Sequence, residues 1–389
     1  MTTRVLSIVG TRPEAIKMAP LLCGLAEDMR FDSRLCVATT QHEQLDDVLG
    51  VFALTPHHEL GVPDEGEDED LFDRTSRALL GLRDVLRAEE PAVVLVHGGT
   101  TACLAGALAA FYAGLPIAHV EAGLRSGNLA RPFPAEANRV LADRLAGLLF
   151  APTGHARQNL LSEGLPPERI VVTGNTGIDA LLAMREIVAG RPAADIDGVP
   201  AHVGQRLERA QGPKVLVTGH RSPDFGPTLQ RVCDAVEEQA RRHADWTFVF
   251  PVHPGPDVLG PVGQRFQGMR NVLVTGAYAY APYVWLLDHC DVILTDSGGI
   301  QEEAPALGKP TIVTRTETER LEAVAAGSAR LVGSDAAAIA AALEELVGDP
   351  AAREAATRAG SLYGDGCASV RIVRELARHF AVEPQAGAA

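Results

Sequence analysis

Several features are missing from this chain of 389 residues, and each absence argues against a class of protein. There is no basic run, and 35 Lys and Arg against 50 Asp and Glu give a net charge of −15, whereas nucleic-acid-binding proteins usually present a basic face. The longest apolar stretches are of strand length or are broken by charges, so none is long enough to span a bilayer. We therefore expect no nucleic-acid partner and no membrane partner.

Cysteine is scarce and scattered. The six cysteines form no C-x-x-C pair, which is typical of a reduced, cytosolic protein. The first residues lead directly into an apolar run, so we expect no signal peptide and a cytoplasmic location. The adjacent His57 and His58 and the acidic run 64–70 are interpreted as loop residues. We therefore expect neither a metal site nor a cofactor.

Apolar runs of strand length alternate with helical patterns along the chain. Continuous apolar strands of this kind are typical of parallel sheets covered by helices on both faces. The strands expected are Val5–Val9, Leu35–Thr39, Val93–His97, Ile117–Val120, Leu148–Ala151 and Ile170–Thr173, then Val215–Thr218, Thr247–Val252, Val272–Val274, Val292–Thr295, Thr311–Thr314 and Ala329–Val332.

The two series of strands predict two doubly wound, Rossmann-like α/β domains. The first domain is expected to comprise residues 1–185, joined by a C-terminal helix within 367–385, and the second residues 186–366. Ligands bind at the carboxyl ends of the strands in such sheets. We therefore expect a site in a cleft between the domains.

The segment from Ile293 to Pro310 is the most informative part of the sequence. A strand leads into the turn Ser297-Gly298-Gly299, and a helix with acidic residues in its first turn follows. The glycines allow close backbone approach, and a helix N-terminus favours a phosphate. Glu303 is placed to accept hydroxyls of a ribose. The alternative is an ordinary strand-to-helix turn with N-terminal acids.

The first strand leads into a second such turn, Gly10-Thr11-Arg12-Pro13-Glu14. Arg12 offers a planar fork and Lys17 a point charge, and both can reach a pyrophosphate from this position. The alternative is a capped helix whose lysine extends toward solvent.

Polar residues also follow two later segments of the first domain. Glu121 stands at the carboxyl end of the strand Ile117–Val120, where it is a candidate acid, base or hydroxyl ligand. Glu136 and Arg139 are three residues apart and share a helix face. An intrahelical ion pair is the alternative for these two residues.

The second domain has its own candidates at strand ends. His220 and His253 each follow a strand and suit acid/base chemistry or a phosphate contact, although a histidine there is as often structural. Tyr283 offers an aromatic surface for a base, and Arg320 a phosphate or hydroxyl contact.

Taken together, these residues resemble the non-hydrolysing bacterial UDP-N-acetylglucosamine 2-epimerase family. The likeness spans nearly the whole chain, through GTRPEAIKMAP, TTQHEQLDDVL, HVEAGLRSG, RPFPAEANR, GNTGIDAL, TGHR, TDSGGIQEEAP and LYGDG. The resemblance implies a glycosyltransferase-B-like fold, usually a homodimer, and reversible inversion at C2 that interconverts UDP-GlcNAc and UDP-ManNAc. UDP leaves, C2 loses its proton to give a glycal-like intermediate, the proton returns on the other face and UDP adds back.

The resemblance also implies roles for individual residues. Glu121, Glu136 and His220 would be catalytic. The substrate, UDP-GlcNAc or UDP, would be held by Arg12, Lys17, Arg139, Tyr283, Ser297, Gly298, Gly299, Glu303 and Arg320. His253 is added to these substrate-binding residues for its strand-end position alone. A second UDP-GlcNAc, acting as an activator, would contact Gln41, His42 and Gln44.

Four positions depart from the family pattern. Gly99 stands where the family usually has an acid, Ala135 replaces the first of two consecutive acids, and Ser222-Pro223 replaces Arg-Glu. We therefore expect an epimerase with an altered acid/base set. The alternatives are a variant that releases UDP, and a UDP-sugar-binding protein that is catalytically silent or repurposed.

Overall fold

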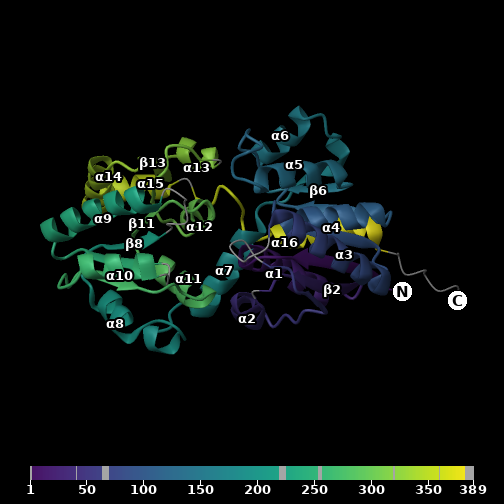
Figure 1. Cartoon of the computed structure of the whole chain (residues 1–389). Coiled ribbons are helices and arrows are strands. Elements are labelled where there is room, and N and C mark those ends of the chain that lie inside the picture. The colour runs from purple at the N-terminus through teal and green to yellow at the C-terminus, as the bar shows by residue number, and fades with distance from the viewer. Residues whose placement is uncertain are drawn as a thin grey trace, which may run out of the picture. The chain divides into compact units, whose positions relative to one another are not determined.

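Two parallel β-sheets organise the chain in the computed structural model (Figure 1). The structure describes residues 2–40, 42–63, 70–218, 225–252, 256–318, 320–358 and 360–381, without the side chains of residues 42–44, 225 and 256–258. One compact unit comprises Met1–Ala180 with Tyr363–Ala389, and the other comprises Leu181–Leu362. Each unit is described below by itself.

The first unit contains a seven-stranded sheet in the order β3-β2-β1-β4-β5-β6-β7. Neighbouring strands pair in parallel throughout this sheet. The strands are β1 (Thr3–Val9), β2 (Phe31–Ala38), β3 (His58–Leu60), β4 (Val93–His97), β5 (Ile117–Val120), β6 (Leu148–Ala151) and β7 (Ile170–Val172). The central strand β4 is buried along its whole length, as its unbroken apolar run requires.

Helices cover both faces of this sheet. The helix α1 packs against α2 and α16, while α4 packs against α3 and α5. The bounds are α1 (Arg12–Glu27), α2 (His42–Val51), α3 (Leu71–Glu89), α4 (Thr101–Tyr112), α5 (Ala135–Leu145), α6 (Gly154–Ser162) and α16 (Ala368–Phe380), with a 3₁₀ turn at Pro167–Arg169. Small side chains along α4 allow this close packing, since most of its buried residues are alanine or glycine.

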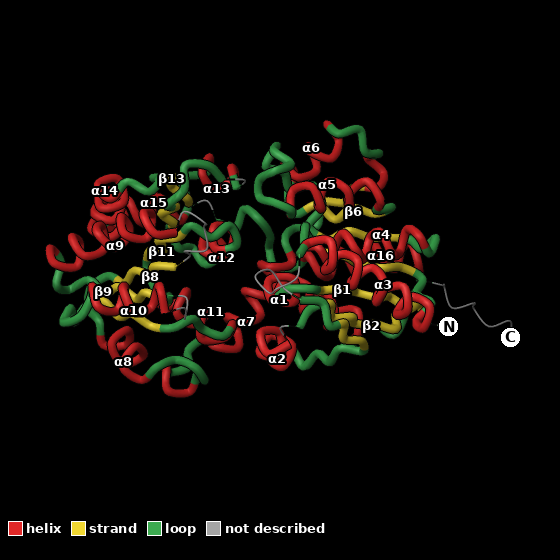
Figure 2. Tube along the Cα trace, in the orientation of Figure 1, coloured by secondary structure: helices red, strands yellow, loops and turns green. Residues whose placement is uncertain are grey.

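The second unit repeats this architecture with a six-stranded sheet in the order β10-β9-β8-β11-β12-β13. The strands are β8 (Lys214–Thr218), β9 (Thr247–Pro251), β10 (Val272–Thr275), β11 (Val292–Thr295), β12 (Thr311–Val313) and β13 (Ala329–Leu331). The helices are α8 (Ala201–Arg209), α9 (Phe225–Arg242), α10 (Pro256–Arg265), α11 (Tyr280–His289), α12 (Ile300–Ala306), α13 (Leu321–Ala325), α14 (Ala336–Gly348) and α15 (Pro350–Thr357), with a 3₁₀ turn at Ala193–Asp195. Figure 2 shows strands at the centre of each unit and helices outside them.

The helix α7 (Thr176–Val188) carries the chain from the first unit into the second, and α16 belongs to the first. In Figure 1 the yellow α16 lies among the purple and blue N-terminal elements. Asp179 anchors it, because its carboxylate accepts the backbone N–H groups of Ala368 at 3.1 Å and Ser369 at 2.7 Å. These are N–H groups of the first turn of α16, which has no side-chain cap of its own.

The predicted fold class of two doubly wound α/β domains is confirmed, and the expected strands are present with ends that differ by a few residues. The strand β3 was missed. It has only three residues and alternates half-buried with exposed positions, so it lacks the apolar run that marks the other strands. Among the helices of the described residues, none combines the length and apolarity needed to cross a membrane.

Candidate active site

Each sheet reverses its strand order at one point, between β1 and β4 in the first unit and between β8 and β11 in the second. The loops that leave the carboxyl ends of neighbouring strands diverge at such a point and leave a crevice, where ligands bind in open α/β sheets. The Gly10–Thr11 turn and the Gly98–Gly99 turn follow β1 and β4, the two strands at this point of the first sheet. The Ser297–Gly299 turn follows β11 at the corresponding point of the second sheet.

Glu121 is the centre of a buried polar cluster in the first unit. It follows β5 directly and has a φ of +66°, a left-handed backbone that costs a residue with a side chain about 1–2 kcal/mol. Its carboxylate pairs with the ammonium of Lys17 and lies 3.8 Å from the guanidinium of Arg139. Strained backbone of this kind is concentrated at functional sites.

The charge of Glu121 depends on these two cations. Burial by itself would raise the pKa of the carboxyl group, but Lys17 and Arg139 outweigh it and hold the pKa below its ordinary value. The carboxylate is therefore ionised at neutral pH. It can accept a proton only weakly as long as both cations face it.

Glu136 lies beside this cluster at the start of α5, and it is buried. Its Oε1 accepts the backbone N–H groups of Ser126 at 2.9 Å and Gly127 at 3.2 Å. Its Oε2 lies 3.6 Å from the Arg139 guanidinium and has no hydrogen-bond partner among the described residues. The ion pair between Glu136 and Arg139, the alternative given for these two residues, is thus present, and Glu136 Oε2 accepts no hydrogen bond from the described residues.

His97, the last residue of β4, belongs to the same cluster and was not among the site residues predicted from the sequence. Its Nε2 lies 3.8 Å from Glu121 Oε2, and neither ring nitrogen has a hydrogen-bond partner within the described part of the chain. Burial lowers the pKa of His97 to about 3, so the ring is neutral at neutral pH. The signal available in the sequence was a histidine that ends a buried strand just before a Gly-Gly turn.

Gly99 and Ala135, the two residues of this unit that differ from the family pattern, are in contact with each other. A Cβ at position 99 would overlap the backbone carbonyl oxygen of Ala135, and Asn138 Nδ2 donates to the Gly99 carbonyl at 3.1 Å. The start of α5 therefore packs directly on the backbone of the turn after β4. No side chain, acidic or otherwise, fits at position 99 in this arrangement.

A buried carboxylate joins the two turns at the crevice. Glu14 accepts the Gly10 N–H at 2.8 Å, the Thr11 hydroxyl at 3.1 Å and the Thr100 hydroxyl at 2.6 Å. Thr100 in turn caps α4, since its hydroxyl accepts the Cys103 N–H at 3.1 Å. Burial raises the pKa of Glu14 to about 7 despite these donors.

A second network of buried hydrogen bonds, centred on His119 and Asp143, holds the turns that follow β4 and β5. His119 contacts the Asp143 carboxylate through Nδ1 at 2.7 Å and the Gly98 carbonyl through Nε2 at 2.8 Å. Asp143 also accepts the Gly123 N–H at 3.2 Å and an Arg125 N–H at 2.7 Å. The turns on either side of Glu121 are thus held by one buried set of hydrogen bonds, which the sequence pattern did not predict.

The Ser297–Gly299 turn of the second unit has a guanidinium packed against it. A Cβ at position 298 would lie 2.9 Å from an Arg320 terminal nitrogen, so the guanidinium would have to shift if another residue replaced this glycine. Arg320 Nε also donates to Glu302 Oε1 at 2.9 Å. The helix that follows, α12, has only seven residues. The Arg320 guanidinium therefore contributes more positive charge at this turn than the N-terminus of this short helix does.

Tyr283 and Glu303 lie together beside this turn. The Tyr283 hydroxyl donates to Glu303 Oε2 at 3.1 Å, and both residues are half-buried. The described binding candidates of the second unit, Tyr283, the Ser297–Gly299 turn, Glu303 and Arg320, thus lie on the side of its sheet where the strands have their carboxyl ends.

The remaining predicted residues are placed as follows. Arg12, in the first unit, donates to Asp47 of α2 at 3.1 Å. Gln41, His220 and His253 lie outside the described residues, as do Ser222 and Pro223. His42 and Gln44 stand at the start of α2, but their side chains are not among those described.

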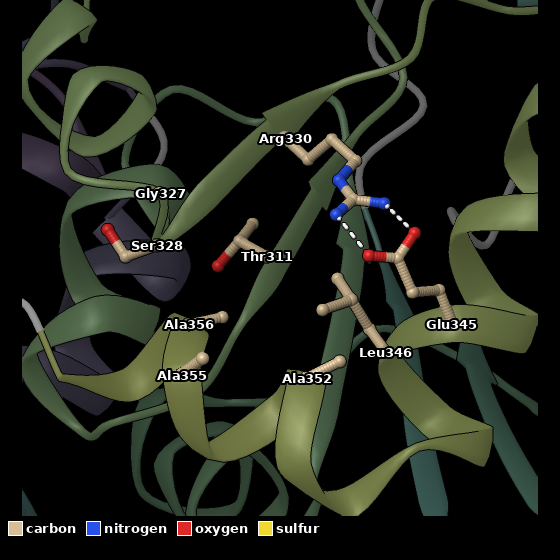
Figure 3. A pocket seen from close by; sticks show the side chains of 9 residues that line it. All are labelled: Thr311, Gly327, Ser328, Arg330, Glu345, Leu346, Ala352, Ala355 and Ala356. Atoms are coloured by element: carbon tan, nitrogen blue, oxygen red, sulfur yellow. Dashed lines mark hydrogen bonds and ion pairs between the residues drawn. The ribbon is translucent and has the colours of Figure 1, made fainter.

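A hollow of about 280 Å³ in the second unit lies elsewhere (Figure 3). Figure 3 shows the Arg330 guanidinium paired directly with the Glu345 carboxylate, with N–O distances of 2.6 and 2.8 Å. Thr311 and Ser328 line it at the amino ends of β12 and β13, the sheet edge opposite to the Ser297–Gly299 turn. It is therefore separate from the candidate site. Among the described residues, no group of His, Cys, Asp and Glu could hold a metal ion.

Comparisons with known proteins match almost the entire chain. The family model described as UDP-N-acetylglucosamine 2-epimerase matches residues 24–377. The chain is 47% identical to the UDP-N-acetylglucosamine 2-epimerase of Yersinia pestis, over 97% of this chain and 99% of that protein. It is 46% identical to the probable UDP-N-acetylglucosamine 2-epimerase of Ralstonia solanacearum, over 97% of this chain and all of that protein.

A solved structure extends the likeness to three dimensions. The crystal structure of UDP-GlcNAc 2-epimerase from Neisseria meningitidis, bound to UDP-GlcNAc, superposes with a TM-score of 0.87 at 38% sequence identity. The alignment covers 97% of this chain and 100% of that one.

The packing at position 99 predicts the effect of a single methyl group. Gly99→Ala is expected to destabilise the protein by about 1–3 kcal/mol, because the Ala135 carbonyl must move. Gly50→Ala is the control, since its added Cβ meets nothing within 4 Å inside α2 and is expected to stabilise the helix by roughly 0.5–1 kcal/mol. Urea unfolding measures both, and equal stability of the two variants would contradict the packing described.

The pKa of Glu14 predicts a pH dependence of stability. An unfolded glutamate has a pKa near 4.5 and the folded one about 7, so folding favours the protonated form. Stability relative to a Glu14→Gln variant is therefore expected to fall as the pH rises from 4.5 to 7, by roughly 3 kcal/mol at most. Thermal unfolding of both proteins across this range measures the difference, and parallel curves would show that Glu14 keeps an ordinary pKa.

Proposed function

Because the chain belongs to the UDP-N-acetylglucosamine 2-epimerase family, we propose that it interconverts UDP-GlcNAc and UDP-ManNAc by the non-hydrolysing route. The observation that carries the proposal is the buried cluster around Glu121, at the strand ends of a chain matched over nearly its whole length. An ionised carboxylate between two cations suits a reaction that separates a diphosphate from a sugar and moves a proton at the neighbouring carbon.

The reaction makes two demands on the first unit. The bond between C1 and the diphosphate oxygen breaks and its electron pair leaves with UDP, so cations must face the diphosphate. The C2 proton passes to a base, and its electron pair forms the C1=C2 double bond. Lys17 and Arg139 supply the cations, and the Glu121 carboxylate supplies the base. The reverse steps on the other face of C2 give the epimer.

Glu136 supplies a second carboxylate for the opposite face. Its Oε2 accepts no hydrogen bond from the described residues and lies 3.6 Å from the Arg139 guanidinium, so that arginine can serve both acids. With no side chain at position 99 and Ala135 in place of an acid, Glu121 and Glu136 are the acids of this chain assigned to proton transfer. His220 joins them by resemblance to the family.

The second unit is assigned to UDP. The Arg320 guanidinium packs against the Ser297–Gly299 turn, and its positive charge suits the diphosphate. Glu303 is assigned to the ribose hydroxyls and Tyr283 to the uracil side. The contact between the two side chains supports these roles, because the Tyr283 hydroxyl already orients the Glu303 carboxylate.

Proton NMR of the protein with UDP-GlcNAc in deuterated water tests the proposal. Epimerisation is expected to place deuterium at C2 and to produce a second anomeric signal from UDP-ManNAc. UDP release with a free sugar or glycal, and no nucleotide-sugar epimer, would instead indicate a variant that stops after elimination. Binding without exchange or turnover would indicate a UDP-sugar-binding protein.

The assignment of UDP contacts predicts two losses of affinity. Arg12→Ala and Glu303→Ala are each expected to weaken UDP binding by roughly tenfold or more, since each removes a charge-assisted hydrogen bond worth about 1.5–3 kcal/mol. Glu354→Ala is the control, because Glu354 is largely exposed on α15 of the second unit. Isothermal titration calorimetry measures the affinities, and unchanged values for both site variants would remove these contacts from the assignment.

A further inference from the structure

His97 is the one member of the buried cluster to which the proposed function gives no role. Its side chain is 4% exposed, and both ring nitrogens lack a hydrogen-bond partner among the described residues. A buried polar atom without a partner is costly, and native proteins rarely keep one unless a ligand or a reaction step uses it. Two such atoms on one ring, beside an ionised carboxylate, indicate a functional position.

The neighbouring strand shows that this fold can satisfy a buried histidine. His119 on β5 uses both ring nitrogens, one on the Asp143 carboxylate at 2.7 Å and one on the Gly98 carbonyl at 2.8 Å. His97 on β4 is buried to a similar degree. The two histidines therefore differ in their hydrogen-bond partners among the described residues and not in how deeply they are buried.

Glu121 Oε2 is shared between two groups. Lys17 pairs with this oxygen, and His97 Nε2 faces it at 3.8 Å, too far for a hydrogen bond. An ammonium on a flexible stem is drawn toward added negative charge. When the diphosphate of a nucleotide sugar attracts Lys17, the oxygen loses its closest donor, and His97 is next to it.

We propose that His97 is a positioning residue for the proton transfer at Glu121. In the complex with a nucleotide sugar, its neutral imidazole donates an N–H to Glu121 Oε2 and holds the carboxylate for the C2 proton. This inference rests on the proposed function, since it assigns Glu121 as the base. When Lys17 moves toward the diphosphate, His97 replaces it as the hydrogen-bond donor to Glu121 Oε2.

The protons balance without another reactant. The C2 proton passes to Glu121, the C–H electron pair forms the C1=C2 bond, and the C1–O pair leaves with UDP. His97 keeps its own proton throughout and only donates a hydrogen bond. Its pKa of about 3 agrees with this role, because the ring is neutral and carries one N–H at neutral pH.

The groups that face Glu121 come from three elements. Among the described residues they are Lys17 of α1, His97 of β4 and Arg139 of α5, with Glu136 behind that arginine. The two cations hold the carboxylate ionised, and the histidine adds a neutral donor. Replacing His97 therefore leaves the charges of the cluster unchanged. A substitution at this position tests the hydrogen bond without removing a charge.

Two substitutions at position 97 separate hydrogen bonding from packing. His97→Leu fills the space without a donor, and His97→Gln keeps an N–H near the position of Nε2. Deuterium exchange at C2 of UDP-GlcNAc is measured across pH for both. His119→Gln is the matched control, a buried histidine on the next strand whose loss is expected to lower stability without moving the pH profile.

We expect His97→Leu to lower the exchange rate roughly 10- to 100-fold, the effect of one hydrogen bond to a charged group. Its acidic limb is expected to move up by about one to two pH units, because Glu121 is easier to protonate without the donor. His97→Gln is expected to recover most of the rate and the original limb.

The opposite results are equally specific. If wild type exchanges C2 but both variants lose rate only in proportion to their folded fraction, with the acidic limb unmoved, His97 is merely structural and this inference is wrong. If His97→Leu keeps the wild-type rate and profile, it is wrong as well. A wild-type protein that binds UDP-GlcNAc but never exchanges C2 would overturn the proposed function and this inference together.

Discussion

The buried carboxylate of Glu121, on its left-handed backbone, stays ionised because cations surround it. The buried polar cluster of the first unit forms around this residue. Three elements must bring their ends together to make the cluster: α1 supplies Lys17, β4 supplies His97 and α5 supplies Arg139. Parallel order in the sheet is what makes this possible, because every strand delivers its carboxyl end to the same edge. The ion pairs are thus a product of topology more than of local sequence.

The supporting contacts show how the turns at that edge are kept in place. Glu14 links the turn after β1 to the turn after β4, and the His119–Asp143 pair links the turns after β4 and β5. Both links are polar, and each includes a backbone group of a turn at the carboxyl end of a strand. Satisfied networks of this kind rigidify the elements they connect. The site is therefore held by hydrogen bonds between loops as well as by the core beneath them.

The sequence predicted the layers well and the contacts less well. Continuous apolar runs identified the strands, and Glu121 follows β5 directly, as its place in the sequence indicated. The sequence pattern did not predict that the His97 ring lacks a hydrogen-bond partner among the described residues, because the surroundings of a buried side chain depend on neighbours far along the chain. Nor did it show that Gly99 and Ala135 touch, since they are on separate elements and only the fold brings a carbonyl over the glycine.

The position of α16 has a consequence for how the chain matures during synthesis. This helix packs on α1 and is capped by Asp179, yet it is encoded after the whole second unit. On a ribosome, the second unit can therefore be complete while the first still exposes the apolar surface that α16 will cover. Segments of this kind favour aggregation and chaperone capture until the missing element arrives. The first unit is thus translated first but can complete its fold only after α16 has been synthesised.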